Sequence, residues 1–420
     1  MKKIIFILLI PCHLFSQGLN FTSEEDLAQI SEPPLDYGFA TDLPTKYSLE
    51  KYVPYVKNQE GGTCVGFSTF YYALSTMYNI EFNITKSVDK FAHSFDPYFI
   101  YSIVFNNSDN CDSGLTFSEA FNSLYKIGSK KLLYPPFTTC NEDWTEEKLA
   151  TTISYTEAYS INQYYILNVK KPNFIENVKQ AIAYDLPVII GVSYLKSMGQ
   201  YSASNNSGVS SSGLWTPSLS EAADGGHALC VVGYDNLKYG GSFRVVNSWG
   251  GDYGDNGYMW ITYDDFKSYT KEAYFMELNE NIKSRPQFKD GLVSIDYKRY
   301  GYKTNNQNIN TYEGQYLNNT PTGYGIWLDE DNDTHYIGKF DNGSMNGFFF
   351  ILDDDGMYSA FGRNGEFEDL NKLGFGEDND QIKQQQLSVS KYFDKFGVEV
   401  NGIRKANSTS GNLVKSSDNE

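Results

Sequence analysis

Basic residues are scarce in this chain of 420 residues, where 34 lysines and arginines face 52 aspartates and glutamates for a formal net charge of −18. A surface of that charge repels phosphate groups, which excludes nucleic acid and anionic membranes as favoured partners. Long apolar runs are absent after the first 16 residues, so we expect no transmembrane segment. Cysteines number five and histidines four, so few residues are available for thiol or acid–base chemistry.

The amino terminus has the features of a secretory leader. Two lysines precede the apolar run Ile4–Ile10, and Ser16 offers a small residue for cleavage, which predicts a signal peptide over residues 1–16. We therefore expect a secreted or periplasmic protein. Cys12 could indicate a lipoprotein, but Pro11 before it is not the small residue that lipid attachment normally follows, so we favour release over lipidation.

Four cysteines remain after the leader, and their contexts differ. Cys111 and Cys140 fall in loops of the same half of the chain, and an exported protein permits disulfides, so their pairing is a hypothesis. Cys230 lies in an apolar segment and is interpreted as a buried free thiol.

Cys64 is the candidate nucleophile. Small residues precede it and an apolar, aromatic run follows it, which predicts a loop that leads into a buried helix with the thiol at its N-terminus. The free amides and dipole of a helix N-terminus lower the pKa of a thiol there, so we expect a reactive thiolate.

His227 is the candidate acid–base residue, because it follows two glycines and begins an apolar run. His13 lies in the leader, and His93 and His335 lack such a context, so we interpret them as surface or structural residues. Asn247, in the segment Asn-Ser-Trp-Gly, can orient an imidazole without taking a proton. Gln59, five residues before Cys64, can join the Cys64 N–H as an oxyanion donor.

These segments, in this order, resemble the papain-like (C1-type) cysteine peptidases. The resemblance implies an α+β, two-lobed fold with a helical lobe, a β lobe and a cleft between them. It implies a polypeptide substrate, no cofactor and no metal. The residues that it carries over are Cys64 as nucleophile, His227 as acid–base, Asn247 as orienter, Gln59 as oxyanion donor, Gly114 as a contact to the substrate backbone, and Trp249, which shields the Asn–His hydrogen bond.

The chain departs from that family in three respects. The loop from Gln59 to Cys64 is one residue shorter than in the plant and animal members. Val65 follows the cysteine where the family signature has an aromatic residue. His227 and Asn247 lie 163 and 183 residues after Cys64, beyond the roughly 130–150 of the family. Inserted loops account for such spacing, and the stretch 194–224 is the best candidate.

At this length we expect more than one domain. The peptidase domain is predicted over 43–282, with helices near 117–127 and 175–184. Strands are predicted over 186–192, 227–234, 243–248 and 257–262. Residues 17–42 form a short N-terminal arm or propeptide, too short for a long helical block, so either the arm lies in the cleft or no zymogen exists.

The C-terminal part carries a weak repeat. Tyr312-Glu313-Gly314 recurs 24 residues later as Tyr336-Ile337-Gly338, and this spacing resembles the MORN repeat of stacked β-hairpins. We predict a small all-β repeat domain over 296–370, followed by a polar tail over 371–420. The repeats could contact a protein or a surface partner, or could serve as a stabilising appendix.

The sequence thus predicts a secreted cysteine endopeptidase that works through a Cys-His-Asn thioester mechanism. Two alternatives stay open. One is an acyl transferase or peptidoglycan-stem amidase that uses the same Cys-His machinery. The other is a catalytically idle papain-like scaffold that acts as a binding protein.

Overall fold

The structure is a computed structural model, and the parts of the chain that it describes are residues 18–34, 42–105, 111–133, 156, 159–199, 207–218, 220–279, 287–288, 300–305, 310–317, 320–329, 332–354, 356–363 and 366–373. The predicted leader, most of the predicted tail and Cys140 lie outside these residues.

A long helical run begins at Cys64, as predicted. It starts as α2 (Cys64–Gly66), passes into the π-helix η2 (Phe67–Leu74) and ends as α3 (Ser75–Glu81). Every side chain of η2 is buried, because the aromatic residues after the cysteine pack into the largest apolar cluster of the molecule. The run is therefore a central element of the core, and it fixes Cys64 at its first turn.

Shorter helices surround this run. One of them, α4, packs against the C-terminal strands, and α6 opens with a capping box between Thr116 and Glu119. The helices and helical turns of the two halves are α1 (Glu24–Leu27), η1 (Glu50–Tyr52), α4 (Ser87–Ala92), α5 (Phe99–Phe105), α6 (Phe117–Lys126), α8 (Phe174–Ala183), η4 (Lys196–Met198), η5 (Lys238–Gly240) and α9 (Tyr263–Tyr269).

The second half is a seven-stranded antiparallel sheet in the order β2-β9-β3-β6-β7-β8, with β1 paired to β6. Its strands are β1 (Lys46–Ser48), β2 (Ile161–Ile166), β3 (Val188–Ser193), β6 (Gly226–Asp235), β7 (Ser242–Val246), β8 (Tyr258–Thr262) and β9 (Thr270–Leu278), and a small hairpin joins β4 (Gly208–Val209) to β5 (Trp215–Thr216). The predicted helices and strands of this region are confirmed to within a few residues. A helical half followed by a β half gives the predicted α+β arrangement.

The C-terminal strands form a separate eight-stranded sheet in chain order. They are β10 (Gln287–Phe288), β11 (Tyr300–Asn305), β12 (Asn310–Leu317), β13 (Thr320–Asp329), β14 (Thr334–Asp341), β15 (Ser344–Asp353), β16 (Gly356–Arg363) and β17 (Glu366–Leu373). All neighbours after β11 pair antiparallel, as stacked hairpins require. The last strand, β17, runs to Leu373, three residues past the predicted boundary at residue 370.

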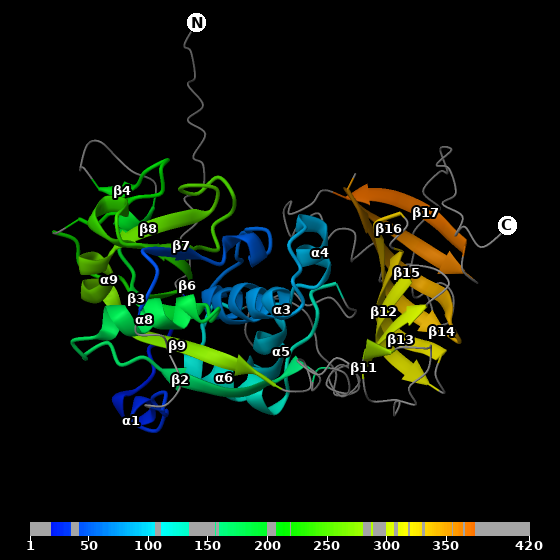
Figure 1. Ribbon diagram of the computed structural model, residues 1–420, viewed down its shortest axis with the longest axis horizontal. Coiled ribbons are helices and arrows are strands. Elements are labelled where there is room, and N and C mark those ends of the chain that lie inside the picture. The colour runs from blue at the N-terminus through cyan, green and yellow to red at the C-terminus, as the bar shows by residue number, and fades with distance from the viewer. Residues whose placement is uncertain are drawn as a thin grey trace, which may run out of the picture.

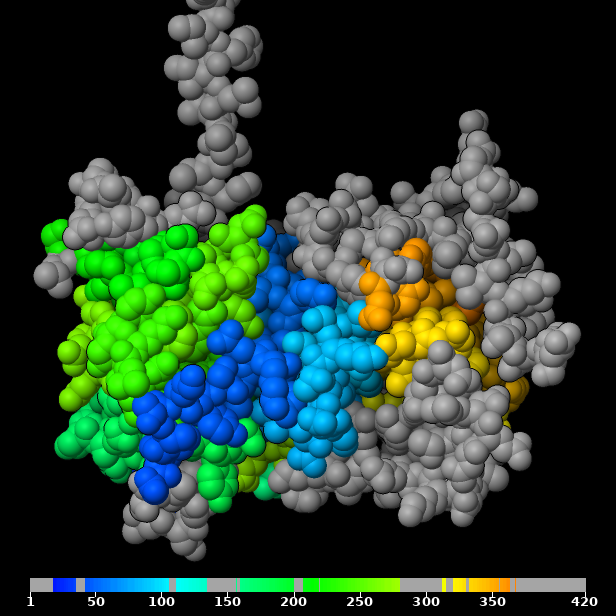
Figure 2. Space-filling view, turned by 45° about the horizontal axis from the view of Figure 1, so that its top comes forward, coloured from blue at the N-terminus to red at the C-terminus, as the bar shows by residue number. Residues whose placement is uncertain are grey.

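Alternate side chains of these strands enter two different apolar clusters. The face toward α4 carries Ile326, Ile337, Phe348, Phe350, Leu352 and Met357, which pack on Val88, Phe91 and Ala92. The opposite face carries Tyr312, Tyr336, Phe340, Met345, Phe349, Ile351, Ala360 and Phe367. Figure 1 shows the resulting arrangement, with α4 between the main body and the C-terminal sheet, and Figure 2 shows the two bodies in continuous contact. Among the described helices, none is long and apolar enough to cross a bilayer.

Candidate active site

The thiol of Cys64 lies where the helical run meets the β half. Its sulfur accepts a hydrogen bond from the backbone N–H of Ala228 on β6, at 3.4 Å between Sγ and N. Ala228 follows His227 directly, so this contact ties the first turn of α2 to the strand that carries the imidazole. Cys64 is fully buried and His227 is 1% exposed.

His227, Asn247 and Trp249 form one compact unit. The Nε2 of His227 lies 2.9 Å from Oδ1 of Asn247, which also accepts the backbone N–H of Ser248 at 2.8 Å. The ring of Trp249 stacks on the imidazole with the centroids 4.8 Å apart and the planes 23° from parallel, and Tyr253 meets Trp249 edge-on. The imidazole is therefore held by one hydrogen bond and one aromatic face, with the indole over the pair as the sequence predicts.

Gln59 is held from two sides. Its amide Nε2 donates to the carbonyl of Gly61 at 2.9 Å, and its Oε1 accepts the hydroxyl of Ser248 at 2.5 Å. A backbone hydrogen bond also runs from Gln59 N to Ser248 O at 2.8 Å. The Gly61 carbonyl can only accept, so it fixes Nε2 as the donor end of the amide, and the Ser248 hydroxyl holds the oxygen end. The sequence does not reveal this contact of Ser248, because the residue is simply part of the Asn-Ser-Trp segment.

The protonation states differ from the sequence expectation. Burial raises the pKa of the Cys64 thiol to about 12, although the N–H groups of Ala228, Gly18 and Val65 favour the thiolate. Burial also lowers the pKa of His227 to about 4, against the opposing effect of the Asn247 hydrogen bond. The expected lowering of the thiol pKa is wrong for this state, because loss of water outweighs the helix N-terminus. Burial therefore favours the neutral forms of both groups in the covered site.

The cover is the chain's own N-terminal segment Gly18–Thr22, which we call the blocking segment. Leu19 forms β-bridges to Leu115 on one side and to Gly226 on the other. Gly18 lies against the loop before Cys64, since a Cβ on Gly18 would lie 1.6 Å from the carbonyl oxygen of Gly62. The segment therefore lies directly over the catalytic candidates, between the helical and β halves.

Gly114, the predicted backbone contact, touches this segment. Its φ is +68°, and a Cβ there would lie 2.4 Å from the carbonyl oxygen of Gly18. Its neighbour Leu115 donates its N–H to Gly18 O at 2.9 Å and accepts the N–H of Asn20 at 3.0 Å. The loop predicted to meet a substrate backbone thus meets the backbone of the blocking segment.

Glu272 on β9 also belongs to this site, and sequence reasoning missed it. Its side chain accepts the Thr22 N–H at 2.9 Å and the Tyr274 hydroxyl at 2.6 Å, and burial raises its pKa. The sequence does show a carboxylate directly before the largely apolar segment Ala273–Leu278. It does not show which segment donates a hydrogen bond to that carboxylate.

The cysteines outside the site are accounted for where the structure describes them. Cys230 is a buried free thiol, as predicted. Cys111 is disulfide-bonded, and its predicted partner Cys140 lies outside the described residues. Within the described ranges, no group of three or more His, Cys, Asp or Glu side chains is arranged to hold a metal ion.

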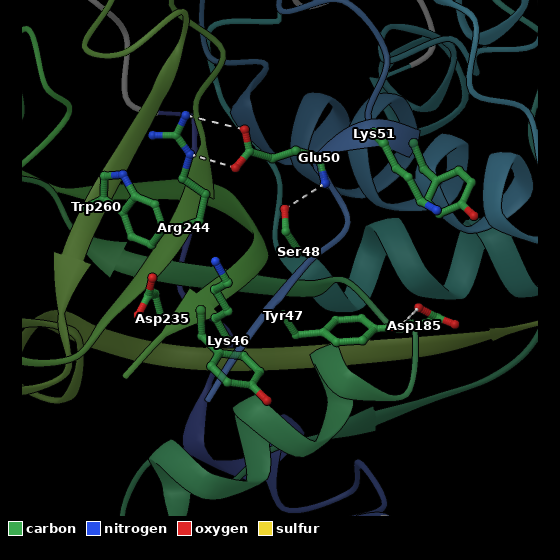
Figure 3. A pocket seen from close by; sticks show the side chains of 11 residues that line it. Lys46, Tyr47, Ser48, Glu50, Lys51, Asp185, Asp235, Arg244 and Trp260 are labelled. Carbon is green, nitrogen blue, oxygen red and sulfur yellow. Dashed lines mark hydrogen bonds and ion pairs between the residues drawn. The ribbon is translucent and has the colours of Figure 1, made fainter. Parts of the chain in front are cut away.

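A separate surface pocket of about 500 Å³ contains none of these groups. Its polar walls bond to one another: Tyr47 donates to Asp185 at 2.7 Å, and Arg244 is paired with Glu50 at 3.0 Å (Figure 3). Asp185 and Glu50 are thus each held by a partner within the pocket walls.

Comparison with known proteins agrees with this geometry. Residues 43–276 match the family model described as papain family cysteine protease. A curated relative, an uncharacterized peptidase C1-like protein of Acanthamoeba polyphaga mimivirus, is 27% identical over 169 residues, 37% of this chain and 49% of that protein. The chain thus spans about half the length of the curated relative that it matches.

Two solved structures are similar in part. Xylellain, a cysteine protease from Xylella fastidiosa, is 20% identical with a TM-score of 0.48, over 63% of this chain and 97% of that one. Procathepsin B S9 from Trypanosoma congolense is 14% identical with a TM-score of 0.47, over 63% of this chain and 87% of that one.

Proposed function

The chain belongs to the papain family of cysteine proteases, and we propose that it is a secreted endopeptidase that cleaves peptide bonds through a thioester on Cys64. The observation that carries this proposal is the unit of His227, Asn247 and Trp249, placed one residue from the backbone donor to the Cys64 sulfur.

In the acylation step the site must first be uncovered, so that water reaches the thiol and the imidazole and their pKa values move toward each other. Cys64 then passes its proton to His227, and the thiolate attacks the carbonyl carbon of the scissile bond. The Cys64 N–H and the Gln59 amide stabilise the oxyanion. His227 returns the proton to the leaving amine, and the C–N bond breaks.

In the deacylation step His227 takes a proton from water, and the hydroxide attacks the thioester carbonyl. The C–S bond breaks, the acid product leaves, and the thiol recovers its proton. Asn247 acts as a positioning residue throughout, because its hydrogen bond to Nε2 directs the other imidazole nitrogen toward the thiol.

The sequence supports two further parts of the proposal. The lysines and apolar run of residues 1–16 support export. The hairpin sheet β11–β17 is compatible with MORN-like repeats, and we propose that it serves the peptidase domain on which it packs.

Active-site labelling tests this function. We would treat a chain that lacks residues 1–22 with an epoxysuccinyl probe and a fluorogenic peptide. We expect one labelled site by intact mass, lost in Cys64→Ala together with at least about a thousandfold of the hydrolysis rate. Cys230→Ala is the matched control, since it removes the other free thiol of the described residues, and it should keep both label and activity.

Two outcomes would contradict the proposal. Products joined to an added amine, in place of hydrolysis products, would identify an acyl transferase on the same machinery. A folded protein that neither takes the label nor hydrolyses any peptide would identify a binding scaffold.

A further inference from the structure

The first turn of the helical run at Cys64 is capped from another helix. Thr63, the residue before the run, makes no capping hydrogen bond with its side chain, because its hydroxyl donates to the carbonyl of Glu60 at 2.6 Å. The first N–H groups of a helix have no partner within the helix. The N–H of Gly66 donates instead to the hydroxyl of Tyr101 on α5, at 3.4 Å between N and Oη. Tyr101 therefore takes the capping role that Thr63 leaves.

The same hydroxyl also binds the loop before the helix. It donates to the carbonyl of Gly62 at 3.1 Å, so the one proton of Tyr101 and a lone pair of its oxygen are both used. Gly62 lies two residues before Cys64, and Gly66 lies two residues after it. A single oxygen atom thus joins the two ends of the segment Gly62–Gly66. The Cys64 N–H, the proposed oxyanion donor, lies between the two bonded peptide groups.

Close packing holds Tyr101 in this place. The residue is 3% exposed. A Cβ on Gly66 would lie 2.9 Å from Cε2 of the tyrosine ring and 2.0 Å from the carbonyl oxygen of Pro97, so any larger residue would push the two segments apart. The loop is also held beside this contact, because the N–H of Gly62 donates to the carbonyl of Cys111 at 2.9 Å. The position of the hydroxyl is therefore set by the packed core and not by the loop that it binds.

The hydroxyl of Tyr101 keeps its proton. Burial raises the pKa of Tyr101 well above its ordinary value, and the neighbouring Cys64 adds to this rise. The Gly62 carbonyl can only accept, so the proton of the hydroxyl is directed at that carbonyl. Tyr101 therefore acts as a fixed hydrogen-bonding group, and not as an acid or a base.

From these contacts we propose that Tyr101 is a positioning residue of the protease, which fixes the backbone of Gly62–Gly66 so that the Cys64 N–H stays directed at the oxyanion. The proposal rests on the proposed function of the same site. This oxyanion donor is a main-chain group, so its direction depends on the peptide groups around it, and Tyr101 binds one on each side. A displaced oxyanion donor weakens binding of the transition state far more than binding of the substrate.

Tyr101→Phe, which removes only the hydroxyl, tests this role in the chain that lacks residues 1–22. The measurements are kcat and KM for a fluorogenic peptide, and the second-order rate of Cys64 alkylation by iodoacetamide, a displacement that forms no oxyanion. We expect kcat to fall by on the order of tenfold to a hundredfold, while KM and the alkylation rate stay within about twofold.

Tyr234→Phe is the matched control. Tyr234 is 1% exposed, and its hydroxyl donates to the carbonyl of Pro44 at 3.0 Å, outside the site. This variant loses a tyrosine hydroxyl from the core in the same way, and it should leave kcat, KM and the alkylation rate unchanged.

The outcomes separate a positioning role from a merely structural one. Loss of kcat with unchanged alkylation supports the proposal. An unchanged kcat would overturn it. An equal fall in kcat and in the alkylation rate would overturn it too, since the whole site would then have been disturbed.

Failure of the proposed function gives a different result. If neither the unaltered protein nor Tyr101→Phe hydrolyses any peptide, the endopeptidase is contradicted, and hydrogen exchange decides the positioning role. The amides of residues 62–66 should then exchange at least about tenfold faster in Tyr101→Phe, with the amides of β6 unchanged. Equal exchange in the two proteins would overturn the proposal.

Discussion

Two buried polar sites of this molecule, the catalytic candidates and the carboxylate of Glu313, are covered in different ways. The catalytic candidates are covered by the five residues Gly18–Thr22, through main-chain bonds and one leucine. At the other end of the helical half, Glu313 of β12 enters the peptidase domain, and the hydroxyls of Tyr78 and Tyr159 donate to its carboxylate at 2.6–2.9 Å. The first site is covered by an uncharged strand. At the second site a charged side chain of the C-terminal sheet is itself buried in the peptidase domain.

The charge at the second site has close neighbours. The Nδ1 of His93 lies 3.4 Å from the Glu313 carboxylate, and the Lys131 ammonium donates to the His93 carbonyl at 2.8 Å and lies 3.4 Å from the ring centre of Tyr78. Burial lowers the pKa of Lys131 to about 7, although Glu313 acts in the opposite direction. Removal of this buried carboxylate would leave several buried polar groups without their partner at once.

The two covers differ in how strongly they are held. Each main-chain bond of the blocking segment contributes about 1 kcal/mol, and ordering each of its residues costs about as much. The C-terminal sheet adds to Glu313 a whole apolar face packed on α4. The C-terminal sheet should therefore be harder to displace than the strand over Cys64.

The largest predicted effect is a loss of stability when the buried contact of Glu313 is removed. Glu313→Ala should lower the free energy of unfolding by about 3–5 kcal/mol, because two tyrosine hydroxyls lose their buried acceptor and the buried Lys131 ammonium loses a nearby opposite charge. Urea denaturation measures it. Glu25→Ala, at an exposed position of α1, is the control and should change it by less than about 0.5 kcal/mol. A loss below about 1 kcal/mol for Glu313→Ala would show that the sheet docks without this contact.

Sequence reasoning reached the first site and not the second. Cys64, His227 and Asn247 each stand in a short segment with its own composition, so order along the chain is enough to group them. Glu313 stands inside a repeat, where its spacing reads as one more hairpin position. Its partners come from helices and loops about 150–240 residues earlier, and no local pattern joins them.

The histidines show the same limit. His93 and His335 were interpreted as surface or structural residues, and the structure supports the structural alternative, with exposures of 8% and 1%. From the length of the N-terminal arm, residues 17–42, the sequence allowed the hypothesis that a short segment lies in the cleft. Leu19, whose buried side chain anchors that segment, lies beside Gly191 and Phe117, which come close only in the folded chain.

A pH titration would sharpen the comparison through histidine. The chain without its predicted leader has three histidines, and burial lowers the pKa of His93 to about 3 and of His227 and His335 to about 4. Their ring resonances should not titrate between about pH 5 and about pH 8, whereas an ordinary histidine titrates near 6.5.

In Leu19→Asp, one resonance should begin to titrate, with a midpoint about 2 units higher. Water then reaches His227, which removes the cause of its lowered pKa, while His93 and His335 stay under the sheet. Because the uncovered imidazole binds a proton below about pH 6.5 and the covered one does not, acid favours the open form through this group. His227→Gln assigns the signal, and titration of all three resonances would mean that both sites had opened.

The smallest predicted effect compares the contribution of a side-chain hydrogen bond of the blocking segment with that of its main-chain hydrogen bonds. Asn20 donates its side-chain amide to the carbonyl of Ser113 at 2.8 Å in an exposed position, and such a bond contributes about 0.5–1 kcal/mol. Asn20→Ala should therefore raise the rate of Cys64 alkylation by only about twofold to fivefold. Thr22→Pro, which removes the N–H bound by the buried Glu272, should raise it by more. If Asn20→Ala instead matched Leu19→Asp, polar side-chain contacts and not the leucine would hold the strand, and the anchor would have to be reassigned.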